Sequence, residues 1–187
     1  MKNTIGLGIM GVVAAAVLLC GGLGGAGQVA EASGTPAETA TLEMLADKIA
    51  LKELVDTFSI LADRKDGLAQ EALFTPDAVV ENYGGDGKLM TSLKGSKEIA
   101  KVYDDFLKTQ DVVYHINGQQ VVRIDGDKAT GTSYCYVVLI STQDGKKVKR
   151  TQGMRYEDEY EKRDGKWLIS KRVAHFNWIE NEDFKGM

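Results

Sequence analysis

The chain has little cysteine, which excludes a fold held together by internal disulfides. Only two of its 187 residues are cysteines, Cys20 and Cys135. Cys20 lies in an amino-terminal segment that we expect to be removed, so Cys135 is left without a partner in the same chain. Cys135 lies in an apolar run, where free cysteine is usually a small buried hydrophobe and not a nucleophile. We therefore expect packing to stabilise this domain.

The sequence also lacks basic runs and clusters of histidine. It holds 27 acidic and 23 basic residues, for a formal net charge of -4. This balance argues against nucleic acid or an anionic membrane as a partner and favours a small molecule or a protein. The two histidines, His115 and His175, have no His-Glu spacing, so we expect no metal site, and no motif indicates another cofactor.

The amino terminus has the pattern of a bacterial export signal. Lys2 precedes an apolar run from Ile5 to Cys20, which is followed by a glycine-rich stretch. Ala30 and Ala32 then supply small residues at the two positions that cleavage requires. The pattern predicts that the protein is exported to the periplasm or secreted.

We accordingly predict three parts of the chain: a signal peptide over 1–32, a polar leader over 33–40 and one domain over 41–187. One alternative is a membrane anchor through residues 5–20, although this apolar run is shorter than the roughly 20 residues of a spanning helix. Lipid attachment at Cys20 is the other alternative.

A long helix is expected at the start of the domain. Thr35-Pro36-Ala37-Glu38 has the form of a capping box, with proline at the first helical position. Apolar residues then recur at the helical period as far as Ala62. We expect this helix, broken at most once, to end near Asp66-Gly67.

Three shorter elements follow in the sequence. A brief helix is predicted over Leu68 to Phe74, stopped by Pro76, and a strand over Asp77 to Tyr83. Gly95-Ser96 opens a third helix. Its apolar face is expected to pack against the sheet and consists of Ile99, Val102, Tyr103, Phe106 and Leu107.

After Val112 the apolar period changes to two, which indicates strands. Three Asp-Gly pairs, Asp125-Gly126, Asp144-Gly145 and Asp164-Gly165, predict the hairpin turns of a four-stranded antiparallel meander. The strands are longer than the usual ~6 residues, so the sheet should curve strongly and form a cone backed by helices, in an α+β fold. We interpret Asn117-Gly118 as a bulge in the first long strand.

A set of short motifs, in this order of elements, resembles one superfamily. The motifs span nearly all of the domain and are Ile49 to Leu54, Leu61 to Asp63, Leu73 to Val79, His115, Ile124 to Ala129, Tyr156 to Tyr160 and Asp164 to Trp167. With the order helix, short helix, strand, helix and four long strands, they resemble the SnoaL-like families of the nuclear transport factor two-like superfamily. The resemblance implies a cone that takes a small, largely apolar molecule. It also implies a homodimer, or a higher homo-oligomer, through the open face of the sheet.

Asp63 and His115 are the candidate catalytic residues. They fall where the branch that contains scytalone dehydratase and bile-acid dehydratases has its acid-base pair, so the resemblance implies that role. An imidazole oriented by a carboxylate can remove a proton beside a carbonyl and return it to a leaving hydroxyl. The alternative is that Asp63 faces water at a helix end and that His115 is a structural histidine. If the two side chains touch, we expect the carboxylate to outweigh burial and to raise the pKa of His115 above its usual value of about 6.5.

One departure from that branch concerns a tyrosine. The branch has it five residues before the aspartate, where this chain has Phe58, so the electrophilic hydroxyl is missing from its usual place. Candidates to replace it are Tyr83, Tyr114, Tyr134 and Tyr136, although such residues are more often core aromatics. The residues expected to contact a substrate are Phe58, Tyr83, Tyr114, Asn117, Tyr134, Tyr136, His175 and Trp178.

Two functions fit these features. One is a cofactor-independent dehydratase or isomerase that uses Asp63 and His115. The other is a noncatalytic module for ligand binding or assembly. A deep cavity in which the two side chains meet would favour the enzyme.

We predict that the mature protein begins at Ser33, because Ala30 and Ala32 are the best small pair after the apolar run. The intact mass of protein from the native host measures this. A species that retains Lys2 would indicate a membrane anchor, and a diacylglyceryl adduct on Cys20 would indicate a lipoprotein.

Overall fold

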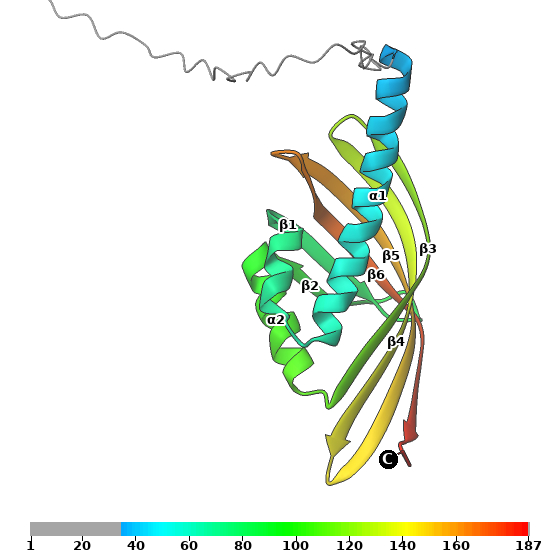
Figure 1. Ribbon diagram of the computed structural model, residues 1–187. Coiled ribbons are helices and arrows are strands. Elements are labelled where there is room, and N and C mark those ends of the chain that lie inside the picture. Colours follow the sequence, from blue (N-terminus) through cyan, green and yellow to red (C-terminus); the bar gives the residue numbers. More distant parts are fainter. Residues whose placement is uncertain (1–34, 187) are drawn as a thin grey trace, which may run out of the picture. The chain divides into compact units, whose positions relative to one another are not determined.

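A six-stranded curved sheet with helices on one side forms the domain (Figure 1). The computed structural model describes residues 35–186, so the predicted signal peptide lies outside the described residues. In chain order the elements are α1 (Pro36–Asp63), the 3-10 helix η1 (Leu68–Leu73), β1 (Phe74–Tyr83), β2 (Leu89–Lys94), α2 (Ser96–Lys108), β3 (Val112–Asp125), β4 (Lys128–Gln143), β5 (Lys146–Arg163) and β6 (Lys166–Asp183). None of the helices within residues 35–186 is both long and apolar enough to cross a membrane. The predicted α+β fold is confirmed.

Helix α1 begins at the predicted capping box. The Thr35 side chain accepts a hydrogen bond from the Glu38 amide, and the Glu38 carboxylate accepts one from the Thr35 amide, with Pro36 at the first helical position. The helix runs unbroken for 28 residues, so its first turn includes residues that we assigned to the polar leader. It ends at Asp63, earlier than expected, because Lys65 adopts a positive φ of 57°. The apolar face of α1 buries Leu51, Leu54, Val55 and Phe58.

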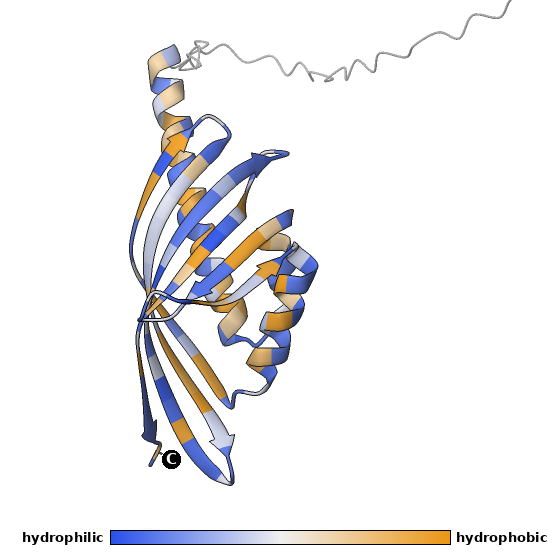
Figure 2. Ribbon diagram, turned by 180° about the vertical axis from the view of Figure 1, so that it is seen from behind, coloured by the Kyte–Doolittle hydropathy of each residue, from blue (hydrophilic) through white to orange (hydrophobic). Residues whose placement is uncertain are grey.

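The order of strands is β2-β1-β6-β5-β4-β3, and only β1 and β6 are parallel neighbours. Strands β3 to β6 form the predicted antiparallel meander. Two of its turns have Asp-Gly at their centre, and both residues of each pair have positive φ, as in Asp144 (48°) and Gly145 (76°). In the first turn Asp125 pairs with Lys128, so the centre is Gly126-Asp127 instead. Apolar and polar bands alternate along these strands (Figure 2), as the period of two predicts.

The edge of the sheet that includes β1 and β2 differs from the prediction. Strand β1 begins at Phe74, before Pro76, and its register with β6 breaks between Phe74 and Val79, where the missing amide of proline is tolerated. Strand β2 was not expected. Its side chains are almost all exposed, so the alternation that marks a half-buried strand is absent.

The predicted bulge in β3 is confirmed, because the register with β4 shifts between Asn117 and Gln120. The shift bends the strand beneath α1. Nearby, the Asn117 side chain accepts a hydrogen bond from the Ser59 hydroxyl at 3.0 Å and donates one to Asp56 at 2.9 Å. These contacts attach β3 to α1.

A buried ion pair lies between two apolar clusters. One cluster, which includes Phe58, fills the end of the cone near the start of β1, and the other includes Tyr156. The Arg172 guanidinium is fully buried, 4.4 Å from the ring centroids of both aromatic residues. Its Nε and Nη2 each donate to Asp158 at 2.8 Å, and Tyr160 donates to the same carboxylate at 2.9 Å. Burial acts to lower the pKa of Arg172, but the carboxylate outweighs it and holds the pKa above its usual value.

Helix α2 corrects one expectation about packing. Ile99 and Leu107 are buried as predicted, whereas Val102 and Phe106 remain 41% and 45% exposed. The expectation that Val102 and Phe106 pack against the sheet is wrong, because this stretch of α2 faces a hollow.

The two kinds of position on α2 should differ in their effect on stability. We predict that Ile99→Ala lowers the free energy of unfolding by about 2 to 5 kcal/mol, because it leaves a void in the filled core. Phe106→Ala should lower it by under about 1.5 kcal/mol, and the exposed control Lys97→Ala by under about 0.5 kcal/mol. Urea melts compare the three variants. A loss of stability in Phe106→Ala as large as that in Ile99→Ala would contradict the finding that Phe106 faces a hollow.

Candidate functional site

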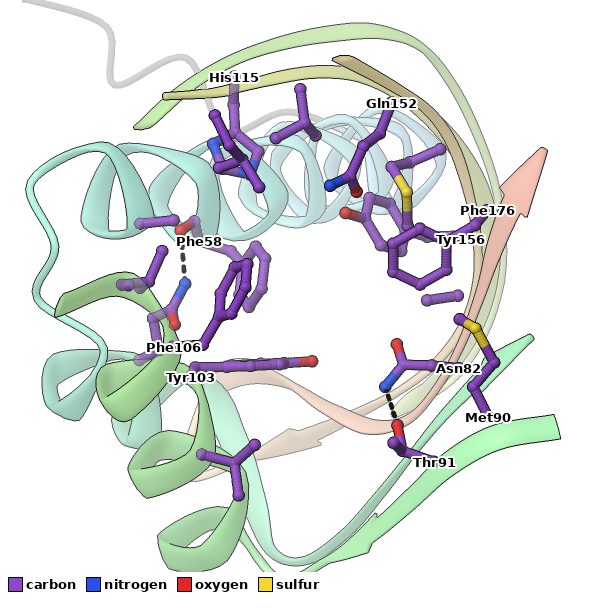
Figure 3. A pocket seen from close by; sticks show the side chains of 18 of the residues that line it. Phe58, Asn82, Met90, Thr91, Tyr103, Phe106, His115, Gln152, Tyr156 and Phe176 are labelled. Atoms are coloured by element: carbon purple, nitrogen blue, oxygen red, sulfur yellow. Dashed lines mark hydrogen bonds between the residues drawn. The ribbon is translucent and has the colours of Figure 1, made fainter. Parts of the chain in front are cut away.

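A partly open cavity of about 390 Å³ lies between the helices and the inner face of the sheet (Figure 3). This volume suits one small molecule. Most of the wall is apolar, and much of it comes from Ala62, Leu107, Val137, Leu139, Met154 and Phe176. The cavity is therefore fit to take a ligand that is itself largely apolar.

Asp63 and His115 meet at this wall. Asp63 is the last residue of α1, and His115 lies on β3, which α1 crosses. The Nδ1 atom of His115 is 2.7 Å from Oδ1 of Asp63. In the neutral imidazole Nδ1 then carries the proton and donates a hydrogen bond to the carboxylate, and no described residue forms a hydrogen bond with Nε2. Nε2 is thus the nitrogen available to a ligand, since His115 lines the cavity.

The pKa of His115 is lower than its usual value of 6.5. Burial of the ring lowers it most, the contact with Asp63 raises it, and the charge of Arg172 lowers it further. The expectation that the contact with Asp63 would win is wrong. The imidazole is only 9% exposed and the carboxylate 29%, so water screens the carboxylate more than it solvates the ring. At neutral pH the imidazole is uncharged and can accept a proton.

Two tyrosine hydroxyls point into the cavity, from Tyr103 on α2 and Tyr156 on β5 (Figure 3). No described residue accepts a hydrogen bond from either, whereas the Tyr160 hydroxyl donates to Asp158. Burial raises the pKa of Tyr103 to about 12 and holds that of Tyr156 above its usual value. Both hydroxyls therefore stay protonated and serve as hydrogen-bond donors.

Sequence reasoning missed both tyrosines as site residues. It assigned Tyr103 to the buried face of a helix and named Tyr156 as part of a family motif. The available signal was the period of two on β5, where Gln152, Met154 and Tyr156 all face the cavity.

Further polar groups lie along the wall. Gln70 donates from Nε2 to the Phe58 carbonyl at 2.8 Å, and its buried Oε1 has no partner among the described residues. Asn82 donates to Thr91 at 2.7 Å, which joins β1 to β2 at the wall (Figure 3).

Of the residues expected to contact a substrate, only Phe58 lines the cavity. Asn117 lies on the inner face of the sheet, but its hydrogen bonds to α1 occupy it. The structure does not place the remaining six around the cavity. These are Tyr83, Tyr114, Tyr134, Tyr136, His175 and Trp178.

Strand alternation explains where those six lie. His115 and Val137 face inward, so their neighbours Tyr114 and Tyr136 face outward. On the outer face Tyr136 packs against Trp178, with ring centroids 6.0 Å apart. Tyr83 and His175 stack there at 5.8 Å.

The remaining candidate chemistry is limited. Within residues 35–186 no group of three or more acidic, histidine or cysteine side chains is placed to hold a metal ion. Cys135 is buried as predicted, and burial raises its pKa to about 12, so its thiol stays protonated.

Comparison with known proteins agrees with the fold. The profile of a family described as SnoaL-like domain matches residues 43–173. An uncharacterized protein of Mycobacterium tuberculosis is 26% identical over 132 residues, which cover 69% of this chain and 84% of that protein.

Solved structures share the fold. A protein of Novosphingobium aromaticivorans assigned as a scytalone dehydratase has a TM-score of 0.65 at 18% identity, over 79% of this chain and 93% of that one. A hexachlorocyclohexane dehydrochlorinase of Novosphingobium barchaimii has a TM-score of 0.62 at 19% identity, over 79% and 96%. At these identities the likeness concerns the fold alone.

The two effects on His115 can be separated by NMR, because a His175→Gln background leaves a single imidazole to follow. We predict a pKa below 6.5 for His115 in that background. In Asp63→Asn the pKa should fall further, because the group that stabilises the charged ring is gone while burial remains. Glu157→Gln, on the outer face, is the control and should leave the titration unchanged. Identical titrations with and without Asp63 would show that the two side chains do not interact in solution.

Proposed function

The chain belongs to the SnoaL-like domain family, and from this premise we propose that it is a cofactor-independent lyase or isomerase that acts on a small, largely apolar carbonyl compound. The observation that carries the proposal is the 2.7 Å contact between Asp63 and His115 at the wall of an apolar cavity. Asp63 and His115 serve as the acid-base pair.

The reaction begins with removal of a proton beside the carbonyl. Neutral His115 accepts the proton at Nε2, and Asp63 holds the Nδ1 proton and stabilises the imidazolium that forms. The electrons of the broken C–H bond move toward the carbonyl oxygen, which becomes negatively charged. Tyr103 donates a hydrogen bond to that oxygen in place of the hydroxyl missing at Phe58, and Tyr156 is the second donor in the wall.

Two outcomes use the proton that His115 then carries. Returned to a hydroxyl that leaves from the next carbon, it forms water and a double bond, which is a dehydration. Returned to a different carbon, it completes an isomerisation. The names of two similar structures, a dehydratase and a dehydrochlorinase, denote eliminations and support the first outcome.

A noncatalytic module for binding or assembly is the second candidate. The outer face of the sheet favours it, because large apolar side chains are exposed there, among them Tyr114, Ile116, Tyr136 and Trp178. Such a face suits association into a homodimer. Export to the periplasm or beyond, proposed from the amino-terminal pattern, is compatible with both candidates.

Proton removal can be tested before the natural substrate is identified. We predict that the protein accelerates exchange of the α-protons of 2-tetralone with D₂O, followed by NMR. His115→Gln should lower the catalysed rate by about 10²-fold or more, and Tyr103→Phe should lower it less. The rate should rise with pH through the lowered pKa of His115 and level off by neutral pH, since the uncharged imidazole is the base.

Tyr134→Phe is the matched control, since Tyr134 has the same orientation on β4 as the outward-facing Tyr136, and it should retain the rate of the parent. A parent rate equal to that of His115→Gln, with all variants folded, would favour the noncatalytic module. Mass spectrometry of a ligand that copurifies would then identify what the cavity holds.

A further inference from the structure

Arg150 stands out among the residues that line the cavity. Within the described part of the chain it is the one lining residue that is always charged, since His115 is neutral at pH 7. No aspartate or glutamate lines the cavity, although the whole chain has 27 of them. An unbalanced cation in an apolar wall indicates that the missing negative charge comes with the ligand.

The surroundings of Arg150 offer it no partner. It lies on the inner face of β5, in alternation with Gln152 and Met154, and is half-buried. Its Nε is enclosed and has no hydrogen-bond partner among residues 35–186.

The nearest acidic side chains on the neighbouring strand lie on the other face of the sheet. Asn181 is opposite Arg150, so Glu180 and Glu182 on either side of it face outward, where Glu182 pairs with Lys149. The guanidinium of Arg150 thus keeps its donors for a group that enters the cavity.

The strand register gives the span between Arg150 and the acid-base pair. His115 lies opposite Val137, which lies opposite Gln152, and Arg150 comes two residues before Gln152 on β5. With a strand spacing of about 4.8 Å and a rise of about 3.4 Å per residue, the two Cα atoms are at most about 12 Å apart. The long arginine side chain shortens this span, so a ligand with one or two rings can reach both.

We propose that the cavity takes an apolar carboxylic acid, whose carboxylate Arg150 binds. Two parallel hydrogen bonds match the planar guanidinium to a carboxylate, and exclusion of water by the apolar wall strengthens them. The inference rests on the proposed function, which places the reacting end of the ligand at His115. It adds that the other end, a carboxylate, is bound by Arg150 on β5. Arg150 is then a specificity residue that orients the ligand toward His115.

A pair of probes with the same rings tests the charge requirement. 2-Naphthoate and 2-naphthamide differ in charge and hardly in shape, and titration calorimetry at pH 7.5 measures the affinity of each. The parent protein should bind the acid about tenfold or more tightly than the amide. Arg150→Met keeps the apolar stem but lacks the charge. It should bind the two probes with equal affinity, and its affinity for the amide should match that of the parent.

Arg155→Met is the matched control, since Arg155 is on the same strand, has an unpartnered Nε and faces outward. It should keep the preference for the acid. Failure of the parent to bind 2-naphthoate, or a preference for the acid that survives in Arg150→Met, would overturn the proposal.

The binding assay and the exchange assay separate this proposal from the proposed function, because recognition of the acid needs no proton transfer. A parent that prefers the acid but shows no exchange of 2-tetralone protons would support the Arg150 site and contradict the proposed enzymatic function. A parent that catalyses the exchange but has no preference for the acid would do the reverse.

Discussion

The buried pair of Arg172 and Asp158 is the interaction on which the rest of the domain depends. Because Arg172 lies between the rings of Phe58 and Tyr156, it connects the filled end of the cone to the wall of the cavity. Both charges are out of water, so either one left alone would carry a large desolvation penalty. The pair therefore keeps two aromatic rings, and through them α1 and β5, in one arrangement. A hollow with fixed walls requires such a constraint, since an apolar core otherwise gains by collapse.

The charge of Arg172 also reaches the titratable groups of the cavity, where burial has the larger effect on their pKa values. The charge of Arg172 lowers the pKa of His115, which favours the neutral base, and it opposes the rise in pKa of Tyr103 and Tyr156, which makes their hydroxyls better donors. Burial and one fixed charge thus act on a base and two donors together. Asp63, in direct contact with the imidazole, sets which nitrogen holds the proton.

Local signals account for what the sequence predicts correctly. The capping box at Thr35, the hairpin turns and the bulge at Asn117 depend on neighbouring residues, and the pattern of each is readable. The meeting of Asp63 and His115 was expected only through the resemblance to a family. Periodicity shows that the face of α2 with Val102 and Phe106 is apolar, but not whether it meets a sheet or a void. The direction of the pKa shift of His115 depends on how well the ring is enclosed, which is a property of the assembled cone.

The alternation of side chains along β4 has an evolutionary consequence. Val137 and Leu139 face the cavity, while Tyr136 faces outward and packs against Trp178. A single substitution on this strand therefore alters one face and leaves the other nearly unchanged. The sheet acts as a partition between two surfaces that can diverge at separate rates. Substitutions that reshape the cavity can therefore accumulate without change to the outer face, and the reverse holds as well.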